Sequence, residues 1–166
     1  NGANWSALSA GVGGTVYALV FDASGYLYAG GRFTEAGQTS AGSIAKWNGK
    51  TWSALGAGLN NAARALAVDT NGNLFAGGEF TNAGGMAANY IARWNGTNWN
   101  ALGAGLNKPV LALATDANGD LYAGGAFTNA GGNPASYIAK CMPTWVEDPG
   151  VSPTNGPVSG GTRVVI

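Results

Sequence analysis

The 166-residue chain carries eight basic and eight acidic residues, and only 10% of its residues are charged, against about 25% in a typical soluble protein. This argues against nucleic acid or an anionic membrane as a partner, because both bind concentrated Lys and Arg. The chain has no histidine and one cysteine, which excludes histidine-based triads, zinc sites and internal disulfides. Its apolar runs are too short to span a bilayer, so we expect no membrane insertion.

A period of 47 residues runs through the sequence. Tryptophan recurs at positions 5, 52 and 99, and the phrases DASGYLYAGGRFTEAG, DTNGNLFAGGEFTNAG and DANGDLYAGGAFTNAG align around their first residue. A period of this length made of short strands is typical of propeller blades rather than of helical solenoids. No segment has the 3.6-residue periodicity of an amphipathic helix. We therefore predict an all-β fold of propeller-type blades.

Each unit is predicted to hold four strands. The first, TVYALVFD at 15–22, is apolar on both faces, as expected of a strand buried between neighbours. An Asp-x-x-Gly turn, in which the Asp side chain bonds the turn backbone, leads to the second strand, YLYAGG at 26–31. The third, SIAKWN at 43–48, ends in an Asn-Gly hairpin that leads into the fourth, TWSALG at 51–56. The Gly-Gly pair of the second strand predicts a bulge or a close backbone approach.

The two ends of the repeat region are complementary. The chain opens with a lone fourth strand, NWSALSAG from Asn4, and closes with strands one to three of a third unit. The third strand of that unit starts at Ile138 with Ile-Ala-Lys, as in the first unit. From Cys141, Cys-Met-Pro then stands where the first two units have Trp-Asn-Gly. Three blades are too few for a closed propeller, which has about four to eight. We expect either further blades in a longer chain or completion by another copy, as a ring or a filament.

The repeat wording, LYAGGxFTxAGG followed by IAxWNGxxW, resembles the kelch-type propeller repeat. The resemblance covers residues 4–140 and is carried by the Gly-Gly pair, the aromatic of strand three and the Trp of strand four. Related repeats occur in bacterial secreted and surface proteins, so the resemblance implies an extracellular or cell-surface location. It implies no single activity, because such blades serve enzymes, binding scaffolds and adhesins.

The last 25 residues differ from the repeats, so we divide the chain into a repeat region at 1–141 and a Pro/Gly-rich segment at 142–166. Its phrase PGVSPTNGPVSGGTRVVI resembles the start of an immunoglobulin-like IPT/TIG domain, which implies a first strand ending at Val164, Val165 and Ile166. A whole sandwich needs about 100 residues. The segment therefore marks either the boundary of a further domain or a strand donated to a neighbouring subunit.

No pattern in the sequence predicts catalysis or a cofactor. Asp116, Asn118 and Asp120 resemble the start of a calcium loop, but Tyr26 stands where the first unit would need the third ligand. We therefore predict turn chemistry and no metal site. Carboxylate pairs can cut glycosidic bonds, yet nothing in the sequence brings two of them together.

Three other features can be interpreted either as ordinary structural elements or as functional sites. The paired tryptophans of strands three and four could stack on sugars, but we predict that they pack between blades. Sequons at Asn4 and Asn95 are candidate glycosylation sites. Cys141 is predicted to be a small, half-exposed residue, with an intermolecular disulfide as the alternative.

Together these patterns predict a non-enzymatic extracellular structural protein that associates with itself by strand completion, as a fibre subunit or an adhesive scaffold. Trp5 and Leu8 are expected in the donated strand, Ile138 on the acceptor, and Val164, Val165 and Ile166 in the tail strand. One alternative is a carbohydrate- or protein-binding propeller module of a longer secreted protein. Another is the non-catalytic part of a secreted enzyme.

Overall fold

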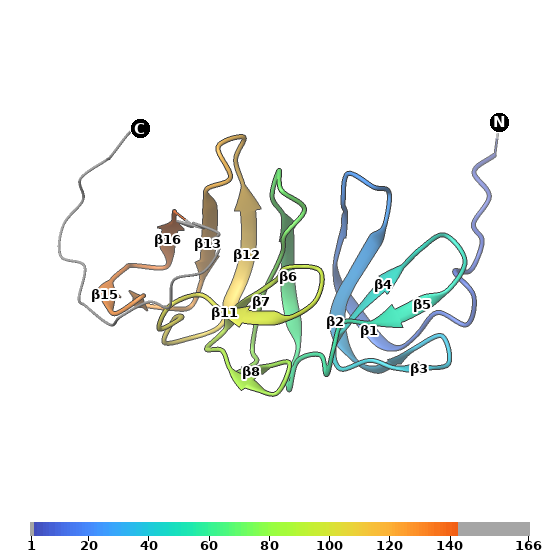
Figure 1. The fold of residues 1–166 in the computed structure, drawn as a ribbon, viewed down its shortest axis with the longest axis horizontal. Coiled ribbons are helices and arrows are strands. Elements are labelled where there is room, and N and C mark those ends of the chain that lie inside the picture. The colour runs from blue at the N-terminus through green and yellow to red at the C-terminus, as the bar shows by residue number, and fades with distance from the viewer. Residues whose placement is uncertain (1, 143–166) are drawn as a thin grey trace, which may run out of the picture.

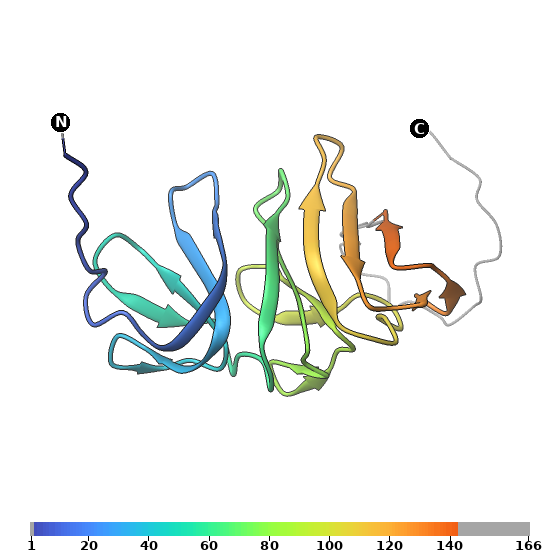
Figure 2. The same cartoon turned by 180° about the vertical axis from the view of Figure 1, so that it is seen from behind.

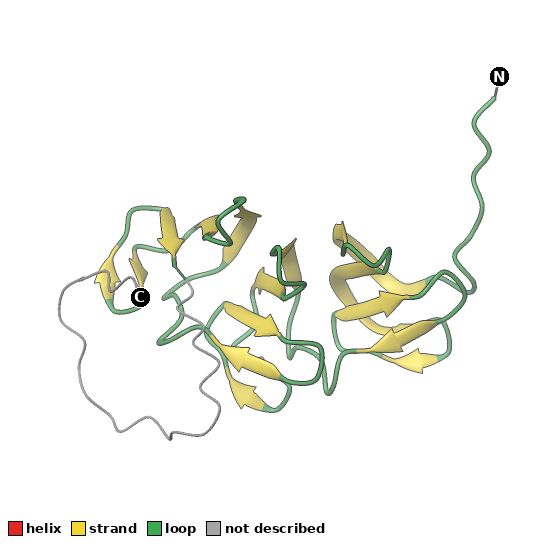
Figure 3. Cartoon of the chain, turned by 45° about the horizontal axis from the view of Figure 1, so that its top comes forward, coloured by secondary structure: helices red, strands yellow, loops and turns green. Residues whose placement is uncertain are grey.

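The computed structural model describes residues 2–142, and every regular element in them is a β-strand (Figures 1 and 3). The prediction of an all-β fold is confirmed for these residues. The strands pair antiparallel in three main sheets, with two short hairpins between them, and none of these sheets closes on itself within the described residues. No helix of residues 2–142 has the length and apolar character needed to cross a membrane. The tail strand predicted at 164–166 lies outside the described residues.

The first two sheets have the same four-strand order, and the third has one strand fewer. The first sheet follows the order β1-β2-β4-β5, with the short β3 (Thr39–Ser40) beside β2, and consists of β1 (Val12–Phe21), β2 (Leu27–Ala36), β4 (Ile44–Trp47) and β5 (Trp52–Ala54). The second follows β11-β10-β7-β6 and consists of β6 (Ala63–Val68), β7 (Leu74–Gly78), β10 (Ile91–Trp94) and β11 (Trp99–Ala101). The third, β12-β13-β16, consists of β12 (Val110–Thr115), β13 (Leu121–Gly125) and β16 (Ile138–Cys141).

Two short hairpins connect the second and third strands of the later sheets. They are β8 (Asn82–Ala83) with β9 (Met86–Ala87), and β14 (Asn129–Ala130) with β15 (Asn133–Pro134). Each hairpin is also tied to the loop that precedes its sheet, through an isolated bridge from Leu59 to Ala83 and from Leu106 to Ala130. The loop before each sheet is therefore fixed against the outer part of the same sheet.

The Asp-x-x-Gly turns join the first two strands of every sheet by the same side-chain contacts. One carboxylate oxygen of Asp22 accepts the backbone N–H groups of Ser24 and Tyr26, each at 2.9 Å. Asp69 and Asp116 accept the equivalent pairs of amides in their own turns. In the first sheet the other oxygen accepts the hydroxyl of Tyr28 at 3.0 Å. Burial of that phenol, followed by this hydrogen bond, raises its pKa well above the ordinary value. These carboxylates therefore order their turns, as predicted.

The Gly-Gly pairs combine a bulge with a close backbone approach. The register of β1 against β2 shifts between Val16 and Ala18, opposite Gly30 and Gly31, and β6 and β12 shift at the equivalent places. A Cβ atom on Gly31 would lie 2.0 Å from the carbonyl oxygen of Thr15. Only glycine can occupy this position without moving the neighbouring strand.

Most of the hydrophobic core lies between neighbouring sheets. One cluster joins residues of the first sheet, including Tyr28 and Ile44, to residues of the second, including Leu66 and Trp99. A second cluster joins the second sheet to the third in the same way. A third cluster, around Phe33, belongs to the first sheet alone. Each sheet is therefore stabilised mainly by the neighbour that covers its face.

The N-terminal segment does not form the strand that the sequence predicts. Residues 2–8 have no strand assignment, and they run away from the first sheet at the end of the molecule opposite β16 (Figures 1 and 2). A strand needs an edge to pair with. In the repeat pattern that edge belongs to a third strand such as β16, which this segment does not reach within the chain.

Candidate assembly site

A tryptophan fastens the fourth strand of each complete sheet to the loop before that sheet. The indole nitrogen of Trp99 donates to the carbonyl oxygen of Leu55 at 2.8 Å, and that of Trp52 donates to Leu8 at 3.0 Å. Each acceptor lies 44 residues before its donor. Trp99 is only 2% exposed, so its ring contributes both apolar burial and a satisfied N–H group.

The tryptophan ring occupies a site shaped by glycine. Gly84 has a φ of 61°, and a Cβ atom there would lie 2.9 Å from Cδ1 of Trp99. Gly37 has the same conformation beside Trp52. The other wall is the last aromatic of the third strand, since the rings of Trp94 and Trp99 lie 5.5 Å apart at an interplanar angle of 53°. A loop carbonyl, a left-handed glycine and a strand-three side chain thus define the tryptophan site.

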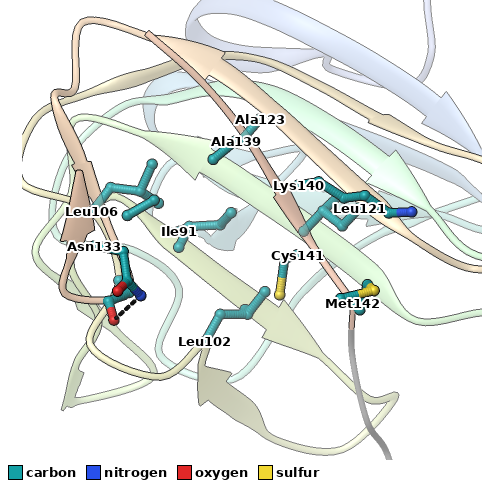
Figure 4. Close-up of a pocket in the computed structure, with 13 residues that line it drawn as sticks. Ile91, Leu102, Leu106, Leu121, Ala123, Asn133, Ala139, Lys140, Cys141 and Met142 are labelled. Carbon is teal, nitrogen blue, oxygen red and sulfur yellow. Dashed lines mark hydrogen bonds between the residues drawn. The ribbon is translucent and has the colours of Figure 1, made fainter. Parts of the chain in front are cut away.

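At the equivalent place of the third sheet, the described residues line a cavity of about 290 Å³ that is partly open to solvent (Figure 4). Its lining includes Leu102, Gly131 and Cys141, the counterparts of the three groups that hold Trp99. Gly131 keeps the left-handed conformation, at a φ of 60°, but a Cβ atom there would meet nothing within 4 Å. We refer to this site as the third-sheet cavity.

The loop before the third sheet already has the conformation that accepts an indole. The carbonyl oxygen of Leu102 accepts the Gly105 amide at 3.0 Å, as Leu55 accepts the Gly58 amide at 3.1 Å. The amide of Gly131 in turn donates to the Gly105 carbonyl at 2.8 Å. The acceptor, the glycine and the loop between them are therefore arranged as in the second sheet.

The outer edge of the third sheet is open within the described residues. β16 pairs with β13, from Gly124–Ile138 to Leu121–Cys141, and no described strand pairs with its other side. Ile138 is 69% exposed, whereas Ile44 and Ile91 at the same repeat position are 0% and 3% exposed. The predicted acceptor residue thus lies on an uncovered strand.

The predicted donor residues differ from one another. Trp5 is 97% exposed, and neither it nor Asn4 contributes to the described strands. Leu8 is already engaged, because its carbonyl accepts the Trp52 indole. Leu8 therefore anchors the segment to its own first sheet, and residues 4–7 belong to no described strand.

A charged pair flanks the cavity without entering it. Nζ of Lys140 lies 2.6 Å from the Asp120 carboxylate, and this hydrogen bond raises the pKa of the lysine. In Figure 4 Lys140 points away from the cavity, and Cys141 points toward Leu102. Desolvation, together with the negative charge of Asp120, raises the pKa of the Cys141 thiol. The thiol is therefore protonated at neutral pH, which does not suit it to act as a nucleophile.

The two sequons lie on exposed residues. The side-chain oxygen of Asn95 accepts the backbone amides of Thr97 and Asn98, and Asn48, which belongs to no sequon, makes the same contacts in the first hairpin. Turn chemistry accounts for an asparagine at this position, so glycosylation of Asn4 and Asn95 stays a prediction.

The sequence interpretation missed the third-sheet cavity and its residues Leu102 and Gly131. The signal was present, because leucine stands at 8, 55 and 102 and glycine at 37, 84 and 131. Their joint role appears only when the loop and the hairpin are seen to meet around one ring. Comparisons with protein-family models and with curated proteins find no match for this chain.

Proposed function

We propose that this is a non-enzymatic structural protein that associates with its own copies through strand completion. The observation that carries the proposal is the match between Trp5 and the third-sheet cavity. Trp5 stands 47 residues before Trp52 and 94 before Trp99, and both of those rings occupy the equivalent sites of their sheets. An exposed tryptophan and a cavity with the walls of a tryptophan site fit each other.

The register of the completed sheets fixes how residues 4–7 would pair. In the first sheet Trp47 pairs with Trp52 and Ala45 with Ala54, and the second sheet repeats this register. Transferred to β16, the same register places Trp5 opposite Cys141 and Ala7 opposite Ala139. The Trp5 indole then points into the third-sheet cavity, within reach of the Leu102 carbonyl.

Another copy is the natural source of the strand. Residues 2–8 and β16 lie at opposite ends of the molecule (Figure 2), so one chain does not bring them together. A head-to-tail contact of this kind repeats from copy to copy and builds a ring or a filament. A free strand edge is also the type of surface on which strand addition occurs.

The proposed setting is extracellular, as a fibre subunit or an adhesive scaffold at a bacterial surface. It is supported by the wording of the repeats, which resembles that of secreted and surface proteins, and by the low charge of the chain. The residues offered for the function pair strands and fill an apolar cavity. They carry no catalytic role in this proposal.

Sedimentation velocity tests the proposal with one variant and one matched control. Wild-type protein is expected to sediment faster as its concentration rises, while Trp5→Ala stays at the monomer mass of 16.6 kDa. Trp145 is the other candidate occupant of the cavity, because it stands seven residues after Ile138, where Trp52 stands eight after Ile44. Trp145→Ala is expected to associate like wild type.

Three results would contradict the proposal. They are association of Trp5→Ala at wild-type strength, loss of association in Trp145→Ala, and a wild-type protein that stays monomeric at every concentration. A dilute monomer that binds glycans without associating would replace the proposal with the carbohydrate-binding alternative.

A further inference from the structure

Side chains that are buried between sheets recur uncovered at the two ends of the molecule. Leu66, on β6, is 8% exposed, while Leu19, at the same position of β1, is 61% exposed. Ile91 is buried, while Ile138, at the same position of the third sheet, is exposed. We define the front face as Val16, Leu19 and Phe21, and the back face as Ala112, Ala114 and Ile138, all of them exposed.

The contacts between sheets show what covers each of these faces. A Cβ atom on Gly30 would lie 3.2 Å from Cδ1 of Leu66, which belongs to the next sheet. One on Gly77 would lie 3.2 Å from Cδ1 of Leu113, again in the next sheet. Each sheet therefore presents a glycine on its back face, against which the next sheet packs a leucine of its innermost strand.

The third sheet presents the same glycine without the leucine. The nearest atoms to a Cβ on Gly124 would be Cβ of Ala112 at 3.8 Å, in the same sheet, and the carbonyl oxygen of Tyr137 at 3.9 Å, in the loop just before β16. At the other end of the molecule, Leu19 is 61% exposed, and no described sheet covers it. The uncovered leucine and the uncovered glycine are the two halves of a contact that occurs twice inside the chain.

We infer that the front face of one copy packs on the back face of another, with Leu19 over Gly124. This second contact takes its partner, another copy, from the proposed function, but it uses neither Trp5 nor the lining of the third-sheet cavity. Ile138 lies on the acceptor strand β16 and also belongs to the back face. It continues the interfaces between the first and second sheets and between the second and third. The partner of each face is therefore the opposite face of the same protein.

The chain connectivity allows both contacts to form in one docking step. Trp5 stands 11 residues before Val16, as Trp52 stands 11 before Ala63. Inside the chain this spacing lets β5 finish one sheet while β6 starts the next, packed on β1. A copy whose residues 4–7 complete β16 therefore carries its own β1 to the back face of the same third sheet.

The second contact is needed because the strand contact alone is weak. One exposed tryptophan buries about 150–250 Å², and each neutral hydrogen bond adds little net stability in water. Association also has to offset the lost freedom of two independent molecules. Burial of the two apolar faces supplies further area at the same place.

The interface between the first and second sheets includes contacts of charged side chains that the contact between copies lacks. Arg32 of the first sheet lies 2.7 Å from Glu79 of the second, and the Arg64 guanidinium lies 4.1 Å from the Tyr17 ring centroid. At the end of the third sheet the counterparts of Arg32 and Tyr17 are Ala126 and Leu111. The contact between copies is therefore apolar, and added NaCl is not expected to weaken it.

Two charge variants test the inference, one on each face. Leu19→Glu spoils the front face and leaves the back face intact, and Ile138→Glu does the reverse. Each alone is expected to associate at least about 100-fold more weakly than wild type, because every contact would bury an unpaired carboxylate. Both positions are exposed in the single chain, so circular dichroism is expected to show an unchanged fold. Met86→Glu, at a site on β9 that is 53% exposed and belongs to neither face, is the control and is expected to associate like wild type.

Mixing the two variants distinguishes specific packing of the front face on the back face from a general loss of association. An intact back face from Leu19→Glu and an intact front face from Ile138→Glu are expected to form a 1:1 heterodimer by sedimentation equilibrium. Absence of the heterodimer, or association of either variant at wild-type strength, overturns the inference. If Trp5→Ala associates normally while this mixture forms the heterodimer, face packing stands and strand completion fails. If Trp5→Ala is monomeric and Leu19→Glu associates normally, strand completion stands and face packing fails.

Discussion

The Trp99 indole donates its N–H to the Leu55 carbonyl at 2.8 Å, and so joins the last strand of the second sheet to the loop that starts it. Trp52 makes the same bond to Leu8. In each complete sheet this bond holds the fourth strand against the loop that precedes the first strand. The third sheet has the acceptor, Leu102, and a cavity for the ring, and Trp5 offers the ring at the other end of the molecule.

Substitution of the three equivalent tryptophans is expected to separate folding from assembly. Trp99→Ala should lower the free energy of unfolding by about 3–5 kcal/mol, because it leaves a cavity in the core between two sheets. Trp99→Phe should lose less, since the ring volume is largely kept. Trp5→Ala should leave the unfolding free energy of the dilute monomer unchanged, because Trp5 is exposed there. Urea denaturation at low concentration measures all three, and a large loss for Trp5→Ala would show that Trp5 packs within its own chain.

The glycines of the back faces give a matched pair. A Cβ atom on Gly77 would lie 2.5 Å from Cγ1 of Val110, so Gly77→Ala should cost about 1–3 kcal/mol of stability through overpacking. Gly124→Ala, at the equivalent position, meets nothing closer than 3.8 Å and should change monomer stability by less than about 0.5 kcal/mol. Its effect should instead appear as weaker association, measured by sedimentation. Equal destabilisation by the two substitutions would contradict this account of the faces.

The carboxylate of Glu79 makes the junction of the first two sheets sensitive to acid. It accepts hydrogen bonds from Nε of Arg64 at 2.8 Å and from Nη2 of Arg32 at 2.7 Å. These contacts lower the pKa of Glu79 below its ordinary 4.5, and the hydrogen bond from Arg64 contributes most. A pKa lowered by folding stabilises the protein above pH 4.5, and this stabilisation disappears as the pH falls through the folded-state pKa.

Glu79→Gln should therefore be less stable than wild type at pH 7, and this difference should narrow as the pH falls below 4.5. The difference should be small, because the pair is partly exposed and screened by water. Urea midpoints at the two pH values measure it, with Glu35→Gln, an exposed carboxylate of the first sheet, as control. A gap between wild type and Glu79→Gln that is as wide at pH 3 as at pH 7 would rule out the carboxylate charge as its cause.

Local features of this fold could be predicted from the sequence, and relations between distant segments could not. The Asp turns, the Asn-Gly hairpins and the glycine bulges each depend on a few neighbouring residues. Asp22, Asn48 and Gly30 were therefore enough to place one of each in the first unit. The strand expected around Trp5 was not formed, because a strand also requires a partner edge, and that edge lies on β16 at the far end of the molecule.

The candidate site was predicted in part for the same reason. Trp5 and Ile138 follow the symmetry of the repeat, and they were identified because the strands that carry them lack the partner strand that the repeat has elsewhere. Gly131 and Leu102 keep that symmetry, and their role depends on which side chain fills the space between them. In the complete sheets that side chain comes from the fourth strand, so the cavity could be recognised only by comparing the three sheets in space.

Disulfide trapping between two chains tests strand completion most directly. In the hairpin between β4 and β5, the backbone N–H of Asn48 donates to the carbonyl oxygen of Thr51 at 3.2 Å. Hydrogen-bonded and non-hydrogen-bonded pairs alternate along an antiparallel ladder. Trp47–Trp52 and Ala45–Ala54 are therefore the closely spaced, non-hydrogen-bonded pairs. The equivalent pair between copies is Ala7 with Ala139, and such a pair suits a disulfide. Substituting both by cysteine, with Cys141→Ser, keeps Trp5 in place.

Mild oxidation of this variant is expected to join residue 7 of one copy to residue 139 of another, giving linked chains on a non-reducing gel and one crosslinked peptide by mass spectrometry. Moving the first cysteine to Ser6, whose side chain points to the opposite face of the strand, should abolish the link, as should adding Trp5→Ala. Absence of the link between residues 7 and 139, or equally efficient trapping from position 6, would contradict completion of the third sheet by the N-terminal strand of another copy.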